Sequence, residues 1–137
     1  MITNRSMPGC TAIPVLAYSD IAEGIEWLCG AFGLTVRVRV GDHRGQLNVG
    51  EGAVVLAQGR PDATAAGGHS VMVRVEDLDL HHERAVARGA KVLQPPTDFP
   101  YGERQYSVED PAGHHWTFSQ SIADVDPRTW GGVPGAL

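Results

Sequence analysis

The sequence predicts an α+β protein made of two consecutive βαβββ units, whose curved mixed sheets surround a concave cleft. Two observations support this fold class. First, an apolar run, a capped helix and a strand follow one another twice, and Asp20 and Gly33 of the first copy correspond to Asp77 and Gly89 of the second. Second, each copy continues into further short strand patterns separated by turn residues. Such an internal repeat constrains a fold more strongly than a single motif does.

The first unit covers residues from about 12 to 58 and begins with the apolar run from Ile13 to Tyr18. Asp20 followed by Glu23 forms a capping box, which predicts the start of a helix, and Gly33 predicts its end. The apolar residues between them recur at helical spacing and form one buried stripe. They are Ile21, Ile25, Leu28, Cys29 and Phe32.

Three strands complete the first unit. Residues 36–40 alternate between Val and Arg, which is the period of a strand with one covered face. Residues 44–49 and 53–58 predict two more strands, separated by the turn Gly50-Glu51-Gly52. The following stretch, 59–68, consists mostly of Gly, Pro and small residues, and it predicts a linker.

The second unit covers residues from about 69 to 120 and repeats the same order. Residues 70–75 predict a strand, and Asp77 caps a helix that ends at Gly89. The next strand is predicted to begin at Lys91 and to stop at Gln94, because Pro95-Pro96 follows.

A hairpin ends the second unit, with strands at 103–109 and 114–120 around the turn Asp110-Pro111-Ala112-Gly113. The remaining residues, 121–137, predict an extended C-terminal arm in which Trp130 anchors against the body or against a partner chain. Residues 1–137 are therefore expected to form one domain.

Composition and charge exclude several classes of function. The net charge is -5 and Lys and Arg do not cluster, which argues against nucleic acid and against an anionic membrane surface. The first residues contain no apolar run typical of a signal peptide, and no stretch has the length of a membrane span, so a cytoplasmic location is expected. Cys10 and Cys29 are not expected to form a disulfide in that compartment.

The two βαβββ units, together with the run Asp110-Pro111-Ala112-Gly113-His114-His115-Trp116 before the last strand, resemble the vicinal oxygen chelate superfamily. That superfamily includes glyoxalase I, extradiol dioxygenases and bleomycin-resistance proteins. The resemblance covers residues from about 13 to 120, and the part from Tyr101 to Gln120 is most similar to the PhnB-like and bleomycin-resistance branch. It implies the fold but not the function, because this scaffold carries isomerases, lyases, dioxygenases, thiol transferases and binding proteins.

The resemblance also implies where a metal ion would be held. In metal-using members, a His or Gln stands seven residues before the helix-capping Asp of each unit, and a Glu or His stands four residues after the Gly of the turn. Here those positions hold Ile13, Ser70 and Thr117. The strand predicted at 53–58 also lacks the acidic ligand of the family. Since these side chains are poor ligands for a divalent ion, we expect no metal and no cofactor.

Strand parity identifies His115 as the best candidate for a functional histidine. In the last strand, Trp116 and Phe118 are expected to face the helices, which places His115, Thr117 and Ser119 on the concave side.

The other histidines have structural explanations. His69 shares the parity of the helix-packed Val71 and lies outside the ligand position unless a bulge shifts the register. His82 shares a helix face with Leu78 and Ala85, which predicts a packed or half-exposed ring beside His81. His114 is expected to serve the hairpin, and His43 to lie in an exposed turn.

The concave side is the predicted site for a small molecule, because a mostly apolar wall with a few polar groups and aromatic edges is typical of such sites. Parity assigns to it Ile13, Val15, Ala17, Ser70, Met72, Arg74, His115, Thr117 and Ser119, with Phe99 and Tyr101 in a loop over its mouth. The alternative is structural: Arg74 pairs with Glu76 or Glu109, and the two rings only pack the loop.

Two functions from different classes follow. The first is a binding protein that sequesters a hydrophobic or aromatic compound without a metal, as bleomycin-resistance proteins do. The second is a glyoxalase-like lyase, isomerase or dioxygenase, either metal-dependent through unusual ligands or using His115 as a general base. The residues at the ligand positions favour the first, and the question of catalysis stays open. The resemblance further implies a homodimer.

Overall fold

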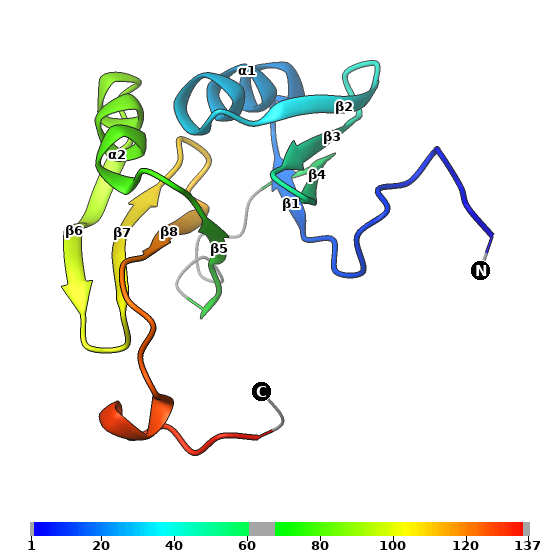
Figure 1. The fold of residues 1–137 in the computed structure, drawn as a ribbon. Helices are drawn as coiled ribbons and strands as arrows, with labels where there is room; N and C mark the ends of the chain where they lie inside the picture. Colours follow the sequence, from blue (N-terminus) through cyan, green and yellow to red (C-terminus); the bar gives the residue numbers. More distant parts are fainter. Residues whose placement is uncertain (1, 61–67, 136–137) are drawn as a thin grey trace.

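A computed structural model of the chain describes residues 2–60 and 68–135. Within them the chain forms two four-stranded sheets and two α helices (Figure 1). The strand orders are β1-β4-β3-β2 and β5-β8-β7-β6, and in each sheet the first pair is parallel and the others are antiparallel. The predicted fold class is confirmed. The predicted linker lies mostly outside the described residues.

The elements follow the repeated order along the chain. The first unit contains β1 (Val15–Tyr18), α1 (Ile21–Phe32), β2 (Thr35–Val40), β3 (Arg44–Val49) and β4 (Gly52–Gln58). The second contains β5 (Val71–Arg74), α2 (Leu78–Ala87), β6 (Lys91–Phe99), β7 (Glu103–Glu109) and β8 (His115–Ser121). A 3-10 helix, η2 (Pro127–Trp130), lies in the C-terminal arm. None of the described helices is long and apolar enough to cross a membrane.

The repeated caps explain where both helices begin. The Asp20 carboxylate accepts the backbone N–H of Glu23 at 3.0 Å, and the Asp77 carboxylate accepts that of Leu80 at 3.1 Å. Each aspartate satisfies a backbone donor that has no partner within its own helix. Gly33 ends α1 with a φ of 74°, a left-handed conformation that favours glycine.

The predicted end of strand β6 is wrong. The sequence places its end before Pro95-Pro96, but the strand runs on to Phe99. Its pairing with β7 shifts register between Gln94 and Thr97, where the prolines lie. Because β6 is the end strand of its sheet, a proline there can leave the inner ladder of hydrogen bonds intact.

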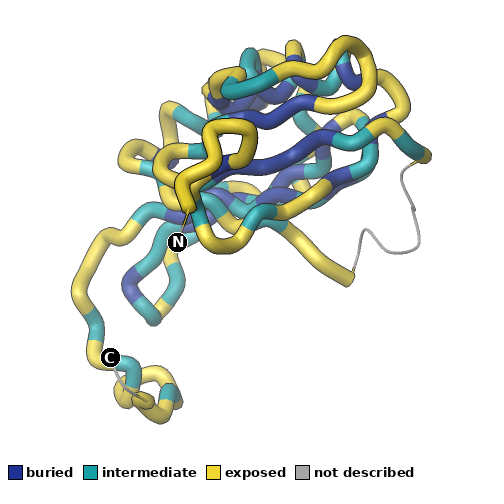
Figure 2. The backbone as a smooth tube through the Cα atoms, turned by 90° about the vertical axis from the view of Figure 1, so that its right-hand side faces the viewer, coloured by how far each residue is buried: buried dark blue, intermediate teal, exposed yellow. Residues whose placement is uncertain are grey.

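The core lies between the helices and one face of each sheet, and Figure 2 shows buried backbone along the strands at the centre of the molecule. Leu16 and Tyr18 of β1 are buried, as are Trp116 and Phe118 of β8. The ring of Phe32, at the end of α1, lies 5.2 Å from Trp116 and 4.7 Å from Phe118. The first helix therefore packs on the sheet of the second unit.

The carboxylate of Asp110 joins the two units. Asp110 is 3% exposed, and its Oδ2 accepts the hydroxyl of Tyr18 at 2.5 Å and the indole N–H of Trp116 at 3.1 Å. Its Oδ1 accepts the backbone N–H groups of Ala112 and His114, both at 3.0 Å. Burial, and then the Asp110 charge, raise the pKa of Tyr18 far above its ordinary value, so the phenol keeps the proton that it donates.

His114 also bridges the units, which goes beyond its predicted role in the hairpin. Its ring is buried, and Nε2 lies 2.7 Å from the carbonyl oxygen of Ala17 in β1. The turn before β8 is thus fixed to β1 by a carboxylate and an imidazole that are close in sequence.

His81, rather than His82, enters the core. The His81 ring lies 4.1 Å from that of Phe118, and its Nδ1 is hydrogen bonded to the hydroxyl of Tyr106. Burial lowers the pKa of His81 to about 4, against the smaller opposing effect of a hydrogen bond with the backbone of Phe32, so the ring is neutral. His82 is half-buried against the edge of Tyr106, and His43 is exposed as predicted.

We predict that Asp110→Ala lowers the free energy of unfolding by about 3 kcal/mol or more, because it leaves several buried donors without an acceptor. Urea unfolding measures this change. Asp110→Asn keeps one acceptor oxygen and should lose less. Asp124→Ala removes an exposed carboxylate and should leave the urea midpoint nearly unchanged. Equal midpoints for Asp110→Ala and the unsubstituted protein would contradict the role of this junction.

A second prediction concerns how the stability of the folded protein depends on pH. Because the folded-state pKa of His81 lies near 4 and the unfolded value near 6.5, the unfolded chain takes up a proton first as the pH falls. The stability contributed by neutral His81 is present above pH 6.5 and is lost below it. Thermal unfolding between pH 7 and 5 should show a falling Tm, and His81→Gln should flatten this dependence. The exposed His43→Gln is the control and should keep the slope. An unchanged slope in His81→Gln would be the contrary result.

Candidate functional site

The candidate site lies on the open face of the second sheet, which is the face turned away from the helices. Alternate residues of β7 and β8 face each other there and form four cross-strand pairs. We call this set the polar ladder, and its pairs are Glu103–Ser121, Gln105–Ser119, Ser107–Thr117 and Glu109–His115. The intervening residues, including Tyr106 and Phe118, belong to the core. The period-two alternation of the strands thus separates an apolar face from a polar one.

Hydrogen bonds connect the two halves of the ladder. Glu109 Oε1 lies 3.3 Å from His115 Nε2, and the hydroxyls of Ser107 and Thr117 lie 2.8 Å apart. Gln105 donates its side-chain N–H to Ser119 Oγ at 3.0 Å, and that hydroxyl donates to Glu103 Oε1 at 2.7 Å. The polar groups of the ladder therefore bond one another.

Both carboxylates of the ladder are held as anions. A hydrogen bond from Ser121, with smaller effects of Ser119 and the Arg74 charge, lowers the pKa of Glu103. A hydrogen bond from His115 lowers the pKa of Glu109, and Lys91 acts in the same direction from 3.4 Å. Each end of the ladder thus carries one negative charge beside a basic side chain.

Met72 and Arg74 extend the open face onto β5, as parity predicts. They pair with Thr117 and Ser119 of β8, and Met72 is 64% exposed. In a purely structural role, Arg74 is expected to form an ion pair with Glu76 or Glu109. The guanidinium instead donates to the hydroxyl of Ser121 at 3.0 Å and acts on the charge of Glu103.

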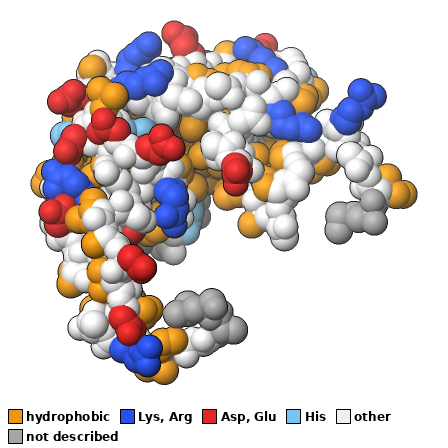
Figure 3. Space-filling view, viewed as in Figure 1, with side chains coloured by type: hydrophobic (Ala, Val, Ile, Leu, Met, Phe, Trp, Pro, Cys, Tyr) orange, Lys and Arg blue, Asp and Glu red, His pale blue; other side chains and the backbone are white. Residues whose placement is uncertain are grey.

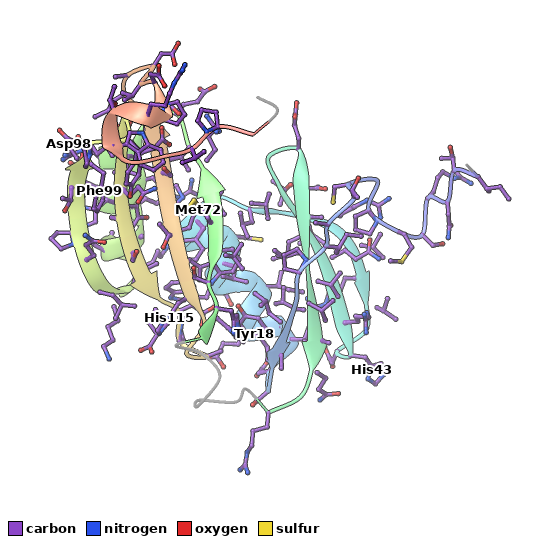
Figure 4. All side chains as sticks on the ribbon, turned by 90° about the horizontal axis from the view of Figure 1, so that it is seen from below. Tyr18, His43, Met72, Asp98, Phe99 and His115 are labelled. Atoms are coloured by element: carbon purple, nitrogen blue, oxygen red, sulfur yellow. The ribbon has the colours of Figure 1, made fainter. Side chains whose placement is uncertain are left out.

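Three aromatic rings close one end of the ladder, and we call them the aromatic end. Phe99 and Tyr101 stack at 5.3 Å with 10° between their planes, and Trp130 meets Tyr101 edge-on at 5.5 Å. The Tyr101 hydroxyl donates to Gln105 Oε1 at 3.1 Å, so this ring reaches over the ladder. Figure 4 shows Phe99 and His115 toward opposite ends of the second sheet.

The open face of the first sheet is more apolar and is partly covered by the N-terminal segment. Val15 and Ala17 of β1 lie on this face, since Leu16 and Tyr18 face the core. Gln46 accepts from Arg37 at 2.6 Å and donates to the carbonyl oxygen of Ser6 at 2.8 Å. Beside these contacts lies a groove of about 610 Å³, between the N-terminal segment and strands β2 and β3.

A separate cavity of about 180 Å³ lies between the start of α1 and the turn before β8. Trp27 and Leu28 of α1, and Pro111 and Ala112 of the turn, form part of its lining. No pattern in the sequence predicts this cavity, and none of the predicted site residues lines it.

The three metal positions of the family hold side chains that do not fit a divalent ion. Ile13 is half-buried just before β1, Ser70 is exposed beside His69, and the Thr117 hydroxyl is bonded to Ser107. Hydroxyl and alkyl groups are weak ligands compared with imidazole, thiolate or carboxylate. Among residues 2–60 and 68–135, no three His, Cys, Asp or Glu side chains lie close enough together to hold a metal.

One strand of the site is not predicted from the sequence. The predicted residues of the second sheet lie on β5 and β8 and none on β7, although Glu103, Gln105, Ser107 and Glu109 alternate with core residues and carry the same period-two signal. The predicted concave wall combines both sheets. Its apolar members Val15 and Ala17 lie on the open face of the first sheet, whereas the ladder of β7 and β8 on the second sheet is polar.

Comparison with known proteins agrees with this architecture. The family model of the Glyoxalase/Bleomycin resistance protein/Dioxygenase superfamily matches residues 11–118. The crystal structure of TioX from Micromonospora sp. ML1 is 36% identical and has a TM-score of 0.70, over 83% of this chain and 100% of that one. An uncharacterized protein of Mycobacterium tuberculosis strain H37Rv is 30% identical over 128 residues, which cover 82% of this chain and 75% of that protein.

A more distant structure shows the same fold. The crystal structure of the fosfomycin resistance protein FosX from Mesorhizobium loti is 18% identical with a TM-score of 0.65, over 83% of this chain and 92% of that one. The fold and the polar ladder define a two-unit protein with one exposed polar sheet face. The chain belongs to the Glyoxalase/Bleomycin resistance protein/Dioxygenase superfamily.

Proposed function

We propose that this protein binds and sequesters a hydrophobic or aromatic small molecule without a metal, in the manner of the bleomycin-resistance members of its superfamily. The observation that carries this proposal is the chemistry at the three metal positions, where Ile13, Ser70 and Thr117 replace the expected ligands. A binding protein needs shape and contact area but no reacting groups, and the aromatic end and the exposed Met72 on β5 both supply such area.

We further propose that two copies associate as a homodimer that encloses the ligand. Strands β1 and β5 each lie at one end of their sheet. Each exposes an apolar side chain toward the open face, Val15 at 56% and Met72 at 64%. End strands with exposed apolar groups are favourable for pairing with another chain. A symmetric partner would cover both strands and add a second wall to each open face.

A second candidate is an enzyme in which His115 acts as a general base. The contact of its Nε2 with Glu109 at 3.3 Å favours this candidate, because a carboxylate can orient an imidazole and stabilise its charged form. The half-buried pair lies at the end of the ladder opposite the aromatic rings. A lyase, isomerase or dioxygenase of the glyoxalase type would use this end.

The first prediction from these proposals is that a panel of acridine, anthraquinone and naphthalene compounds contains at least one saturable ligand. Native mass spectrometry measures binding, and chromatography after prolonged incubation should recover the ligand unchanged. Binding should persist in EDTA, because no metal takes part.

The comparison of two variants separates binding from catalysis. His115→Ala should still bind the ligand, and so should the exposed control His43→Ala. Turnover that disappears in His115→Ala but not in the control would establish the enzyme instead. Absence of binding across the whole panel would contradict sequestration.

The second prediction is a mass in solution of twice 14.6 kDa, measured by light scattering after gel filtration. The double variant Val15→Lys with Met72→Lys should dissociate the dimer, because it places charges on both end strands. Val36→Lys, a control on exposed β2, should leave the mass unchanged. A monomeric unsubstituted protein, or a dimer that survives the double variant, would contradict this interface.

A further inference from the structure

The C-terminal arm begins with a tight contact to the turn that carries Tyr101. The carbonyl oxygen of Gly102 accepts the backbone N–H groups of Ile122 at 2.8 Å and Ala123 at 3.3 Å. A Cβ at Gly102 would lie 2.4 Å from the carbonyl oxygen of Ala123, and its φ is 84°. Only glycine meets both conditions without strain, so the arm and this turn form one local structure.

Beyond this contact, the arm forms a short helix with defined ends. The Asp126 carboxylate accepts the backbone N–H of Arg128 at 3.0 Å, and Gly131 ends the helix with a φ of 96°. Yet no residue of η2 is buried. Figure 3 shows the arm curling below the body, with a hollow between the two. Burial in the core therefore does not explain why the arm carries a large aromatic residue.

Trp130 is the residue of η2 that reaches the candidate site. Its ring lies 5.5 Å from that of Tyr101 at an angle of 61°, and 45% of the residue is exposed. An edge-on contact leaves part of the indole surface free for a further ring. The arm thus adds a third ring beside Phe99 and Tyr101.

We infer that Trp130 is a specificity-determining residue, which selects planar fused-ring ligands that carry an N–H donor. This inference rests on the proposed binding function. The rings of the aromatic end offer flat surfaces for stacking. Next to them, the network of Gln105, Ser119 and Glu103 ends in a carboxylate, which accepts a hydrogen bond from an amine or amide.

Proflavine, a planar tricyclic compound with amino groups, is the probe for this inference. Its own fluorescence anisotropy reports binding, so substitution of a tryptophan does not remove the signal. Trp130→Leu should weaken proflavine binding about tenfold, because the substitution removes the ring that packs against the flat face of the ligand. Trp130→Phe should recover most of the affinity.

Decylamine, which has an amino group but no ring, tests selectivity by displacing proflavine. Its affinity should be equal in the unsubstituted protein and in Trp130→Leu. Val133→Ala, on the exposed part of the same arm, is the matched control and should bind proflavine normally. Thermal unfolding of Trp130→Leu should match that of the unsubstituted protein, since no residue of η2 is buried.

The outcomes separate this inference from the function on which it rests. Equal proflavine affinity in Trp130→Leu and the unsubstituted protein overturns the role of Trp130 while leaving sequestration intact. Equal weakening of proflavine and decylamine overturns ring selection. If the unsubstituted protein binds neither proflavine nor any compound of the earlier panel, the proposed function itself fails.

Discussion

The buried carboxylate of Asp110 fixes the relation between the two units. It accepts hydrogen bonds from Tyr18 of the first unit, from Trp116 of the second, and from two N–H groups of its own turn. A charge removed from water is tolerated only with such partners, because its desolvation costs several kcal/mol. Formation of this turn is therefore coupled to the docking of β1, and His114 strengthens the same contact through the carbonyl oxygen of Ala17.

This junction leaves the open faces of the sheets free to vary. The core is built from the helices and the opposite sheet faces, with Phe32 packed against Trp116 and Phe118. Substitutions in the polar ladder therefore change few core contacts. Such a separation of stability from surface chemistry gives a physical reason why one superfamily carries binding proteins and several classes of enzyme.

The sequence predicts the parts of this structure that depend on local rules. Both capping aspartates and the faces of β5 and β8 follow from spacing alone, because helix caps and strand parity are local. The run of β6 past Pro95 depends on its position at the edge of the sheet, which a local pattern does not encode. The partners in the ladder, such as Gln105 and Ser119, depend on the register between strands, and this is set by the whole hairpin.

The internal bonding of the ladder determines where binding energy can come from. Each hydrogen bond contributes only about 1 kcal/mol net, and a ligand that displaces the Ser119–Glu103 bond gains less than that. Apolar burial contributes about 25 cal/mol per Å², so about 200 Å² of ring surface supplies about 5 kcal/mol. Association costs at least about 4 kcal/mol, so a single ring on one open face would be held weakly. Tight binding at this site therefore requires a ligand of several rings, or a second wall that a partner copy would provide.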